Sequence, residues 1–448
     1  MVTWRNWSGA VTCEPSRIVR ASTVEHVQAA VTSALHEGTG VRIAGSGHSF
    51  TRLVATDEVL IDPRGLNQIE AVEEATARAT LGAGARICDL GAPLETRGLS
   101  LLNQGDIHAQ AISGAVSTGT HGTGLGLGSL SSAVTGLTLV TGEGQVIDCD
   151  AHREPEIFHH ARVGLGSLGV ITRVQMQLRE PYLLREEKRT LPLRRCLETI
   201  DELSRAHRHV EFFWFPYTEV AAVKILDEVD GPRRPATLRH LLVDQAFENA
   251  AWWVACELSR RGFRPTPDIA RFCANTFSES SRVARSWEIF PNPRWVRFNE
   301  MEYAVPVERG VEAFLAVKDL IEREQLDVLF PIEYRYVRGD DIPLSPFVGR
   351  DCAVISCHVY RGKSYEGYFR AVEEIMLAHG GRPHWGKMHA LEAPQLRGLY
   401  PAWESFLELR ARLDPRGCFV SPYTARIFGV PNPRVTAPTR GLRTPLRW

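Results

Sequence analysis

Residues 42–50, RIAGSGHSF, form a glycine-rich turn that is the most informative stretch of this chain. The residues at 41–44 predict a short strand that runs directly into the turn. Gly45 and Gly47 free the backbone, so successive N–H groups can form a concave nest for a pyrophosphate. His48 stands at the tip of this turn, where a histidine of the protein core would be unusual.

A second segment of the same character follows about 60 residues later. Residues 101–130 contain seven glycines with serine and threonine between them, and the segment is too long for a simple turn. Loops of this length inside a compact domain usually serve a function or act as linkers. Two such loops between strands suggest one large anionic cofactor held between them, and the alternative is that they are only tight loops.

The flanking sequence alternates between short strands and amphipathic helices. Ser22 and Glu25 form a capping box, so a helix is expected from Val24 until Gly38. Strands are expected at residues 41–44, 59–61, 76–81, 137–140, 328–337 and 353–360. Further helices are expected at 365–379 and from 401 to about 414. Trp252, Trp253, Leu258 and Phe263 indicate a helix pair, interpreted as core packing of a second domain rather than a membrane or partner surface.

Composition limits the class of protein. The 448 residues carry 52 Lys and Arg against 53 Asp and Glu, a net charge of −1 that argues against nucleic-acid binding. The 44% of hydrophobic residues is ordinary for a soluble globular protein, and no apolar run has the length of a signal peptide or a spanning helix. Nine scattered cysteines without C-x-x-C spacing predict reduced thiols in a cytoplasmic protein and no metal site.

Two segments imitate nucleotide-binding motifs. Residues 164–169 fit G-x-G-x-x-G, but the β-branched residues that follow predict a strand where a dinucleotide fold needs a helix. Residues 381–388 nearly fit a P-loop, but Met388 stands where the Mg²⁺-binding hydroxyl is required, and a helix precedes the motif. We therefore interpret the first segment as no dinucleotide-binding motif and the second as no P-loop.

Five blocks, taken in order, resemble the vanillyl-alcohol oxidase superfamily, in particular its sugar-1,4-lactone oxidase and alditol oxidase branch. They are GSGHSF at 45–50, GDIHAQAISGAVSTGTHGTG at 105–124, GLGSLGVIT at 164–172, EYR at 333–335 and HWGK at 384–387. The resemblance implies a two-domain α+β flavoprotein. Residues 1–180 would form a PCMH-type FAD-binding domain, 181–390 an α+β substrate cap domain, and 391–448 a segment that returns to the FAD domain and ends in a Pro/Arg-rich surface tail.

The resemblance also implies the FAD contacts. The pyrophosphate would lie against residues 44–49, and His48 matches a histidine that many members bond covalently to the flavin. The positions that match cofactor contacts are Ala44, Gly45, Ser46, Gly47, His48, Ser49, Gly105, Ser113, Gly114, Ser117, Thr118, Gly122, Gly169, Val170 and Ile171.

The candidate catalytic residues are Glu333, Arg335, Lys387, His384 and Asp106. Glu333 and Arg335 are two apart on an expected strand, so they share a face, either as a structural ion pair or in the flavin pocket. In the pocket, Arg335 would hold the substrate hydroxyl, and Glu333 would orient Arg335 or share the proton. The cation of Lys387 would meet negative charge on the reduced flavin, whereas His384 and His358 are expected to orient other groups.

Two positions bear on the acceptor and the substrate. Gly105 matches a place where the family's dehydrogenases carry a bulkier residue that keeps oxygen from the flavin, so glycine favours an oxidase. Asp106 matches a serine of the alditol oxidases, which argues against a simple polyol and favours a lactone or a substrate carrying an amine.

The resemblance predicts oxidation of an alcohol on a small carbohydrate, most often an aldono-1,4-lactone. A hydride would pass to flavin N5, and O₂, giving H₂O₂, or another acceptor would reoxidise the flavin. One alternative keeps this chemistry and changes the substrate to a polyol or an aminosugar intermediate. A second alternative is a binding protein with a degenerate flavin fold, which the presence of all the candidate residues argues against.

Overall fold

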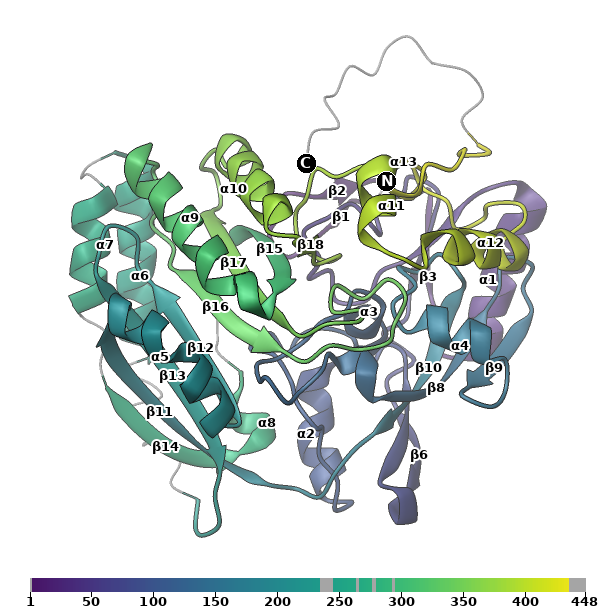
Figure 1. Cartoon of the computed structure of the whole chain (residues 1–448). Helices are drawn as coiled ribbons and strands as arrows, with labels where there is room; N and C mark the ends of the chain where they lie inside the picture. The colour runs from purple at the N-terminus through teal and green to yellow at the C-terminus, as the bar shows by residue number, and fades with distance from the viewer. Residues whose placement is uncertain (1, 234–244, 263–265, 276–278, 292–294, 435–448) are drawn as a thin grey trace.

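The computed structural model describes residues 2–233, 245–262, 266–275, 279–291 and 295–434. The chain forms two halves, each built on a large antiparallel sheet with helices outside it (Figure 1). This is the α+β class that the resemblance implies, so that prediction is confirmed.

A small parallel sheet begins the first half. It has the order β3-β5-β4, with β3 at Arg17–Arg20, β5 at Val59–Asp62 and β4 at Val41–Ile43. Helix α1, Val24–Glu37, begins at the N-cap Thr23 and ends at Gly38, whose φ of 68° is left-handed. The expected helix is confirmed from Val24 to Gly38, but the expected Ser22–Glu25 capping box is wrong, because the N-cap is Thr23, whose hydroxyl accepts from the N–H of His26 at 3.3 Å. Ahead of this sheet, β1 (Trp4–Arg5) pairs with β2 (Thr12–Cys13).

A five-stranded antiparallel sheet completes the first half. Its order is β6-β7-β10-β8-β9. The strands are β6 (Ile69–Glu73), β7 (Arg78–Gly82), β8 (Val134–Val140), β9 (Val146–Asp150) and β10 (Val170–Gln177). Helices α2 (Ile87–Glu95), α3 (Ile112–Ser117) and α4 (Pro155–Ala161) belong to the same half. Because strand β10 follows the glycines of 164–169, the rejection of a dinucleotide motif is confirmed.

The second half is an eight-stranded antiparallel sheet of order β14-β11-β13-β12-β16-β17-β15-β18. Its strands are β11 (Leu183–Pro192), β12 (His209–Trp214), β13 (Val220–Glu228), β14 (Ser280–Arg285), β15 (Phe298–Pro306), β16 (Ile332–Val337), β17 (Cys352–Tyr360) and β18 (Arg382–Pro383). Helices α5 (Leu193–Ala206), α9 (Gly310–Arg323) and α10 (Glu366–Ala378) cover its outer face (Figure 1). Helices α6 (Gln245–Arg260), α7 (Thr266–Asn275) and α8 (Ser286–Ile289) lie at its margins.

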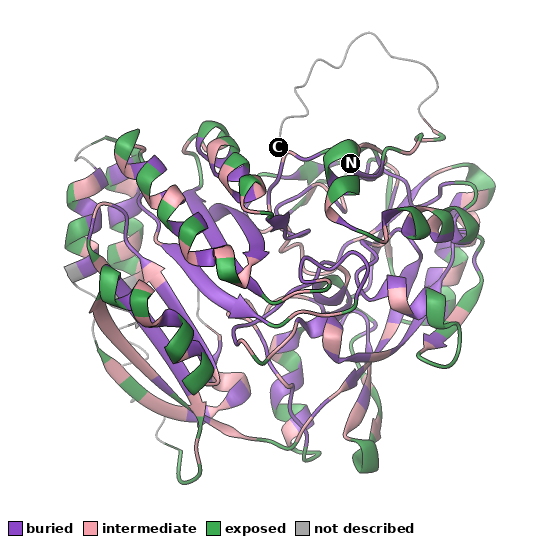
Figure 2. Cartoon of the chain, in the orientation of Figure 1, coloured by how far each residue is buried: buried purple, intermediate pink, exposed green. Residues whose placement is uncertain are grey.

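The central strands of this sheet are buried on both faces (Figure 2). The two faces differ in chemistry. Side chains such as Met301, Tyr303 and Tyr334 join the apolar core beneath the covering helices. Their neighbours in sequence, such as Glu302 and Glu333, point to the opposite face because successive side chains of a strand alternate. That inner face turns toward the first half of the molecule.

The last helices return to the first half. Helices α11 (Ala393–Leu399), α12 (Trp403–Leu413) and α13 (Pro422–Phe428) contribute Leu396, Phe406 and Ile427 to the same core as the five-stranded sheet. Ile342 and Trp385 also belong to this core, so parts of 181–390 pack with the first half. The domain boundaries at 180 and 390 remain a proposal.

Several expected boundaries need correction. Strand β16 starts at Ile332 rather than 328, because Pro331 has no N–H to donate to a ladder. Strand β7 starts at Arg78 because residues 74–76 form a 3₁₀ turn and Ala77 has a φ of 50°. A short helix, α3, interrupts the expected long loop at 101–130. The other expected strands and helices are present within a few residues of their expected bounds.

The interpretation of the helix pair at 252–263 as core packing is wrong for part of it. Trp252 lies against Phe330, with ring centroids 5.2 Å apart, as a core residue would. Trp253 is 51% exposed and Leu258 is 37% exposed, because they lie on other faces of α6. Phe263 and the tail beyond residue 434 lie outside the described residues.

All nine cysteines are free thiols, as their scattered spacing predicts. Within the described ranges, every helix is too short or too polar to span a bilayer.

Candidate active site

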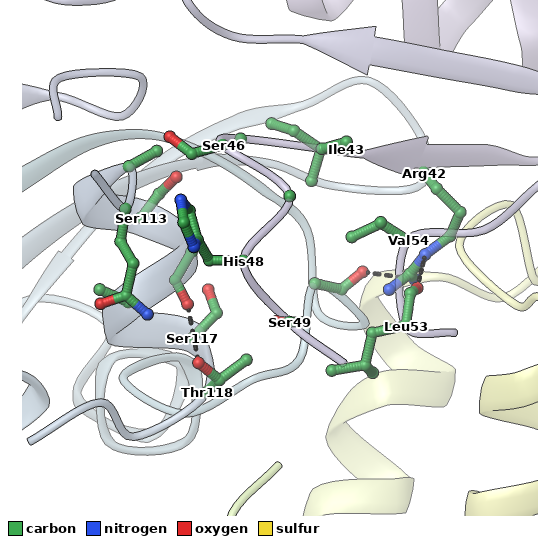
Figure 3. Close-up of a pocket in the computed structure, with 18 of the residues that line it drawn as sticks. Arg42, Ile43, Ser46, His48, Ser49, Leu53, Val54, Ser113, Ser117 and Thr118 are labelled. Atoms are coloured by element: carbon green, nitrogen blue, oxygen red, sulfur yellow. Dashed lines mark hydrogen bonds between the residues drawn. The ribbon is translucent and has the colours of Figure 1, made fainter. Parts of the chain in front are cut away.

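The first of two cavities lies between the glycine-rich turn and helix α3. It contains about 840 Å³ of space, part of which is open to solvent. Residues 42–49 form one wall, α3 a second, and residues from Leu165 to Ile171 a third. Figure 3 shows Ser46, His48 and Ser113 around this space.

The turn at 42–50 needs its glycines for two reasons. Gly47 has a φ of 69°, which side chains other than glycine rarely adopt. A Cβ on Gly45 would lie 2.7 Å from the Cβ of Ala111, so only glycine lets the turn approach α3 this closely. The nest predicted from the sequence therefore has the backbone that it requires.

Arg42 holds the walls of this cavity together. Its buried guanidinium donates hydrogen bonds to the carbonyls of Leu53, Leu165, Gly166 and Phe419 at 2.7–3.0 Å (Figure 3). These four carbonyls come from segments that are far apart in the sequence. Burial lowers the pKa of Arg42 to about 10, which leaves it charged at neutral pH.

His48 points into the first cavity and also lines the second (Figure 3). Its ring stacks on Trp7 with centroids 5.7 Å apart. Burial, with smaller contributions from Lys387 and His108, lowers its pKa to about 4. The imidazole is therefore neutral at pH 7, and a neutral imidazole is the form that can act as a nucleophile.

The walls of the first cavity fit FAD. The Ser46 hydroxyl is buried and has no hydrogen-bond partner among the described residues, so a bound group can satisfy it. A Cβ on Gly114 would meet open space rather than protein, which leaves room for a ligand beside α3. These features suit a long polar group that makes contacts with backbone and hydroxyls.

The second cavity adjoins the first and encloses about 780 Å³ of empty space. The two cavities share the wall residues His48, Ser49, Gln110 and Thr118. The inner face of the eight-stranded sheet supplies much of the second cavity's lining. Its polar side chains from the sheet are Glu300 and Glu302 on β15, Glu333 and Arg335 on β16, and His358 on β17.

Arg335 lies at the centre of this polar face. Its guanidinium binds Glu302 at 2.9 Å and Glu333 at 3.0 Å, and Glu302 also accepts a hydrogen bond from Ser356. The Arg335 Nε is buried and has no partner among the described residues. An unpaired buried donor in a cavity wall can bind a ligand oxygen.

Glu333 is a carboxyl of this cavity whose pKa is raised well above its ordinary value. Burial raises its pKa to about 8, and the nearby Glu211, Asp106 and Glu302 add to the effect against the opposing charge of Arg335. Glu302 differs because His121 and Arg335 hold its pKa well below the usual range. Two carboxyls on the same face therefore have opposite tendencies, as in acid–base sites.

The HWGK segment enters the cavity from the other side. Lys387 forms an ion pair with Glu300, and its Nζ lies 5.2 Å from the centre of the Phe50 ring. The backbone N–H of Phe50 donates to the carbonyl of Gly386 at 2.7 Å, so this segment runs beside the glycine-rich turn. His384 accepts a hydrogen bond from the N–H of Gly386, and burial lowers its pKa to about 3.

Asp106 and Gly105 line the same cavity from the long loop. Lys224 forms ion pairs with Asp106 at 3.3 Å and with Glu211 at 2.9 Å. Asp106 is therefore already paired with a cation, which removes the reason to expect a substrate amine. A Cβ on Gly105 would lie 2.9 Å from the carbonyl oxygen of His121, so a larger residue requires this backbone to shift.

The structure brings together most of the residues expected from the sequence. The first cavity is lined by Ala44, Gly45, Ser46, Gly47, His48, Ser49, Ser113, Gly114, Ser117, Thr118, Gly169 and Ile171. The second is lined by all of Asp106, Glu333, Arg335, His384 and Lys387. The roles of the first set in binding FAD and of the second set in catalysis are still predictions.

Two expected cofactor contacts lie elsewhere. Gly122 lines neither cavity, and its Cβ position is filled by the carbonyl of Gln104 at 2.5 Å, so this glycine serves close packing. The Val170 side chain is buried in the core around α1 because it alternates with Gly169 and Ile171 along the strand.

Sequence reasoning missed several wall residues, above all Glu300, Glu302 and His121. The signal for the two glutamates is their alternation in FNEMEY at 298–303, which places charges on one face of a strand. Nδ1 of His121 donates to the carbonyl of Gly122 (2.8 Å), and its Nε2 lies 2.9 Å from a carboxylate oxygen of Glu302. Although His121, Glu302 and His384 are close enough to hold a cation, the adjacent Arg335 disfavours one there.

Comparison with known proteins agrees with this geometry. Residues 15–150 match a family model described as an FAD binding domain, and residues 174–427 match one described as D-arabinono-1,4-lactone oxidase. The protein is therefore an FAD-dependent oxidoreductase with a separate FAD-binding domain. Because the second match covers more than half of its length, the chain belongs to the D-arabinono-1,4-lactone oxidase family.

Curated relatives span nearly the whole chain. The L-gulono-1,4-lactone dehydrogenase of Mycobacterium tuberculosis is 41% identical and covers 95% of this chain and 99% of its own. The L-gulonolactone oxidase of Scyliorhinus torazame is 30% identical, with 95% and 98% covered. Among solved structures, a solvent-stable cholesterol oxidase has a TM-score of 0.83 at 18% identity, covering 96% of this chain and 97% of its own, which shows a shared fold.

Proposed function

We propose that this protein oxidises a hydroxyl group of an aldono-1,4-lactone, with FAD in the first cavity and the lactone in the second. The observation that carries the proposal is the unpaired Nε of Arg335 in the wall of a cavity that adjoins the FAD cavity. The relatives named as gulonolactone and arabinonolactone enzymes support the substrate class.

Bound FAD would supply the hydride acceptor for this reaction. Arg335 would hold the substrate oxygen through its unpaired Nε, while Glu302 and Glu333 fix the guanidinium from its other nitrogens. Glu333, whose pKa is raised to about 8, would take up the hydroxyl proton in its deprotonated form, which predominates above that pH. The Lys387 ammonium would stabilise negative charge that develops beside it.

A lactone fits this cavity better than an aminosugar does. Asp106 pairs with Lys224, so a substrate ammonium would have to displace a protein cation from a nearly buried ion pair. A lactone offers hydroxyl and carbonyl oxygens to Arg335 and carries no charge of its own. Gly105, which places no side chain in the cavity, supports O₂ as the acceptor.

Turnover on substrate panels tests the proposal. Purified protein loaded with FAD should oxidise L-gulono- or D-arabinono-1,4-lactone faster than alditols or aminoglycosides, with O₂ consumption and dye reduction measured in parallel. Greater turnover on an alditol or aminoglycoside would overturn the substrate assignment.

We further propose that FAD is bonded covalently to His48. The neutral imidazole and its position in the cavity wall support this. Acid precipitation should leave the yellow colour in the protein pellet, and His48→Ala should release it to the supernatant. Colour in the wild-type supernatant would limit His48 to a non-covalent contact.

We also propose that the protein acts in the cytoplasm. Nine free cysteines without a disulfide support a reducing compartment. Fractionation of cells that express the tagged protein tests the location.

A further inference from the structure

A third, smaller cavity lies behind the wall of the second. It encloses about 230 Å³ of empty space, and its polar lining residues are Ser259, Asp327, His358 and Lys363. About 10 Å³ of this space is open to the centre of a water-sized sphere, and one water needs roughly 10–15 Å³ by that measure, so the cavity has room for a single water at most. His358 is the residue that lines both this cavity and the second.

The His358 ring is fixed between aromatic side chains. It lies edge-to-face with Phe298 at 5.0 Å and stacks on Phe330 at 6.1 Å between ring centroids. Its side chain is 9% exposed. This packing fixes the plane of the ring, so its two nitrogens keep different surroundings.

The two ring nitrogens of His358 have different environments. Nε2 lies 3.5 Å from Oε1 of Glu300, which faces His358 directly across the β15–β17 pair. Nδ1 is buried and has no hydrogen-bond partner among the described residues. A buried polar nitrogen beside a cavity is commonly satisfied by water.

On the substrate side, Glu300 connects His358 to Lys387. The Glu300 carboxylate pairs with the Lys387 ammonium through Oε2 and faces His358 through Oε1. All three residues line the second cavity. A proton on Oε1 can therefore pass to the imidazole, and because Lys387 and His358 lower the pKa of Glu300 to about 2 against the effect of burial, the carboxylate holds that proton only briefly.

On the outer side, the small cavity ends at a polar cluster. Lys363 forms an ion pair with Asp327 at 2.6 Å and donates to the hydroxyl of Ser259 at 2.9 Å. The Asp327 side chain is 58% exposed, so this cluster reaches bulk solvent. Because His358 lines both this cavity and the second, a water in the small cavity that contacts Nδ1 would connect the substrate cavity to this surface cluster.

We propose that Glu300, His358 and water in this small cavity form the exit path for the proton that the substrate hydroxyl loses. This inference rests on the proposed function, because only oxidation of an alcohol releases that proton.

The transfers balance at every step. Oxidation breaks the C–H bond, whose electron pair leaves with the hydride, and the O–H bond, whose proton enters the cavity wall. Glu333, the base of the proposed function, takes up this proton and releases it through water in the second cavity to the Glu300 carboxylate, which passes it to Nε2 of His358. The imidazole releases its proton on Nδ1 to a water, which carries it past Asp327 to solvent, so the ring is neutral before and after and its proton has moved from Nδ1 to Nε2. The 3.5 Å between Glu300 and His358 is of the length that such bonds have before substrate binds.

The alternative is that His358 only fills space in the core. His160 provides the matched case, because it is equally buried and its Nδ1 also has no partner among the described residues. His160 differs by lying in the first half of the molecule, on α4, away from the first and second cavities. A core role would make the two histidines respond alike to the same substitution.

The first test is independent of any substrate. A crystal structure of the FAD-loaded protein should show an ordered water within hydrogen-bond distance of His358 Nδ1 and connected to Lys363 or Asp327. A dry cavity would overturn the proposal whether or not the protein oxidises lactones.

The second test uses chemical rescue. Flavin bleaching by L-gulono-1,4-lactone is followed by stopped flow in wild type, His358→Ala and the control His160→Ala, with bound FAD checked by its visible spectrum. We expect His358→Ala to bleach at least tenfold more slowly, and added imidazole to restore the rate in proportion to its concentration. His160→Ala should keep the wild-type rate and show no response to imidazole.

The outcomes separate this proposal from the proposed function. If no lactone bleaches the flavin of the wild-type protein, the proposed function is contradicted. The crystal structure, through the presence or absence of the ordered water, still decides the proton path. A normal rate in His358→Ala, or a slow rate that imidazole does not restore, overturns the path while leaving the function standing. If His358→Ala does not fold, Lys363→Met at the outer end of the path replaces it. We expect Lys363→Met to bleach more slowly and small buffers to restore its rate. An unchanged rate in Lys363→Met would overturn the path.

Discussion

The first and second cavities are built in opposite ways. The first is lined by backbone, glycines and hydroxyls. Among its described lining residues, the charged side chain is Arg42, whose hydrogen bonds to backbone carbonyls hold the walls together. The second is lined by ion pairs between strands, centred on Arg335. A site for a large cofactor can therefore depend on local turns, whereas the reactive site depends on charges that only the folded sheet brings together.

The largest effect is expected from breaking the charged cavity. Replacing Arg335 by methionine leaves Glu302 and Glu333 buried without their cation, and breaking a buried pair costs about 3–5 kcal/mol. We expect kcat/KM on a lactone to fall by about 10²- to 10³-fold, the loss typical of removing a donor that stabilises developing charge on the substrate. Arg309→Met, which removes an exposed pair with Glu312, should leave it unchanged. A loss below tenfold for Arg335→Met would contradict a central role.

The next effect concerns the frame of the first cavity. Arg42→Met removes four hydrogen bonds to buried or partly buried carbonyls. We expect the free energy of unfolding to fall by about 3 kcal/mol, measured by urea denaturation, and FAD to be lost with it. Arg17→Met, which breaks an exposed ion pair with Glu37, should change the free energy of unfolding by less than about 0.5 kcal/mol. Equal effects of the two substitutions would show that Arg42 is dispensable for the walls.

The pH dependence of activity sharpens the contrast between the carboxyls. The pKa of Glu333 is raised to about 8, so its carboxyl is protonated below that pH and becomes a base above it. We therefore expect kcat/KM to rise with pH and to level off above about pH 8. Glu333→Gln should be slower and should lose this rise. A wild-type profile that falls across this range would contradict the role as a base.

A smaller effect is expected at the junction of the cavities. In Gly105→Ala the new Cβ would meet the carbonyl oxygen of His121 at 2.9 Å and fill space beside the second cavity. We expect reoxidation by O₂ to slow about tenfold, equivalent to about 1.4 kcal/mol, with less effect on turnover with a dye acceptor. Equal losses with both acceptors would indicate displaced backbone rather than a blocked oxygen path.

The smallest effect is expected from a single hydroxyl of the first cavity. Ser46→Ala removes a buried Oγ that has no protein partner among the described residues, so any loss reports a ligand contact. FAD affinity should fall about fivefold, or about 1 kcal/mol, by titration of apoprotein. In a covalently loaded protein the same contact should appear as slower incorporation. Ser33→Ala, on the exposed side of α1, is the matched control.

Sequence reasoning succeeded where function depends on residues close together in the chain. The turn at 42–50 and the helix capped by Thr23 follow from backbone preferences that act over a few residues. Glu333 and Arg335 share a face because they are two apart on one strand. The resemblance to a family added the cofactor and the chemistry, which composition and spacing do not contain.

Sequence reasoning failed where neighbours are far apart in the chain. Glu300 faces His358 and Glu211 faces Arg335 only because β15 pairs with β17 and β12 with β16 in one register. The strand at 298–306 was not expected at all, so its two glutamates had no place in the predicted site. Val170 shows a different error. Its segment lies beside the first cavity as expected, but side chains alternate along the strand, so the Val170 side chain points into the core rather than toward the cavity.

The sequence by itself determined the glycine-rich turn, the capped helix and the alternating strands, since steric limits on φ and ψ act within a few residues. Only the tertiary structure decided which charges meet, that Lys224 neutralises Asp106, and that His358 separates two cavities. The physical reason is that the order and register of strands follow from burying one apolar face under the helices, a free energy summed over the whole sheet.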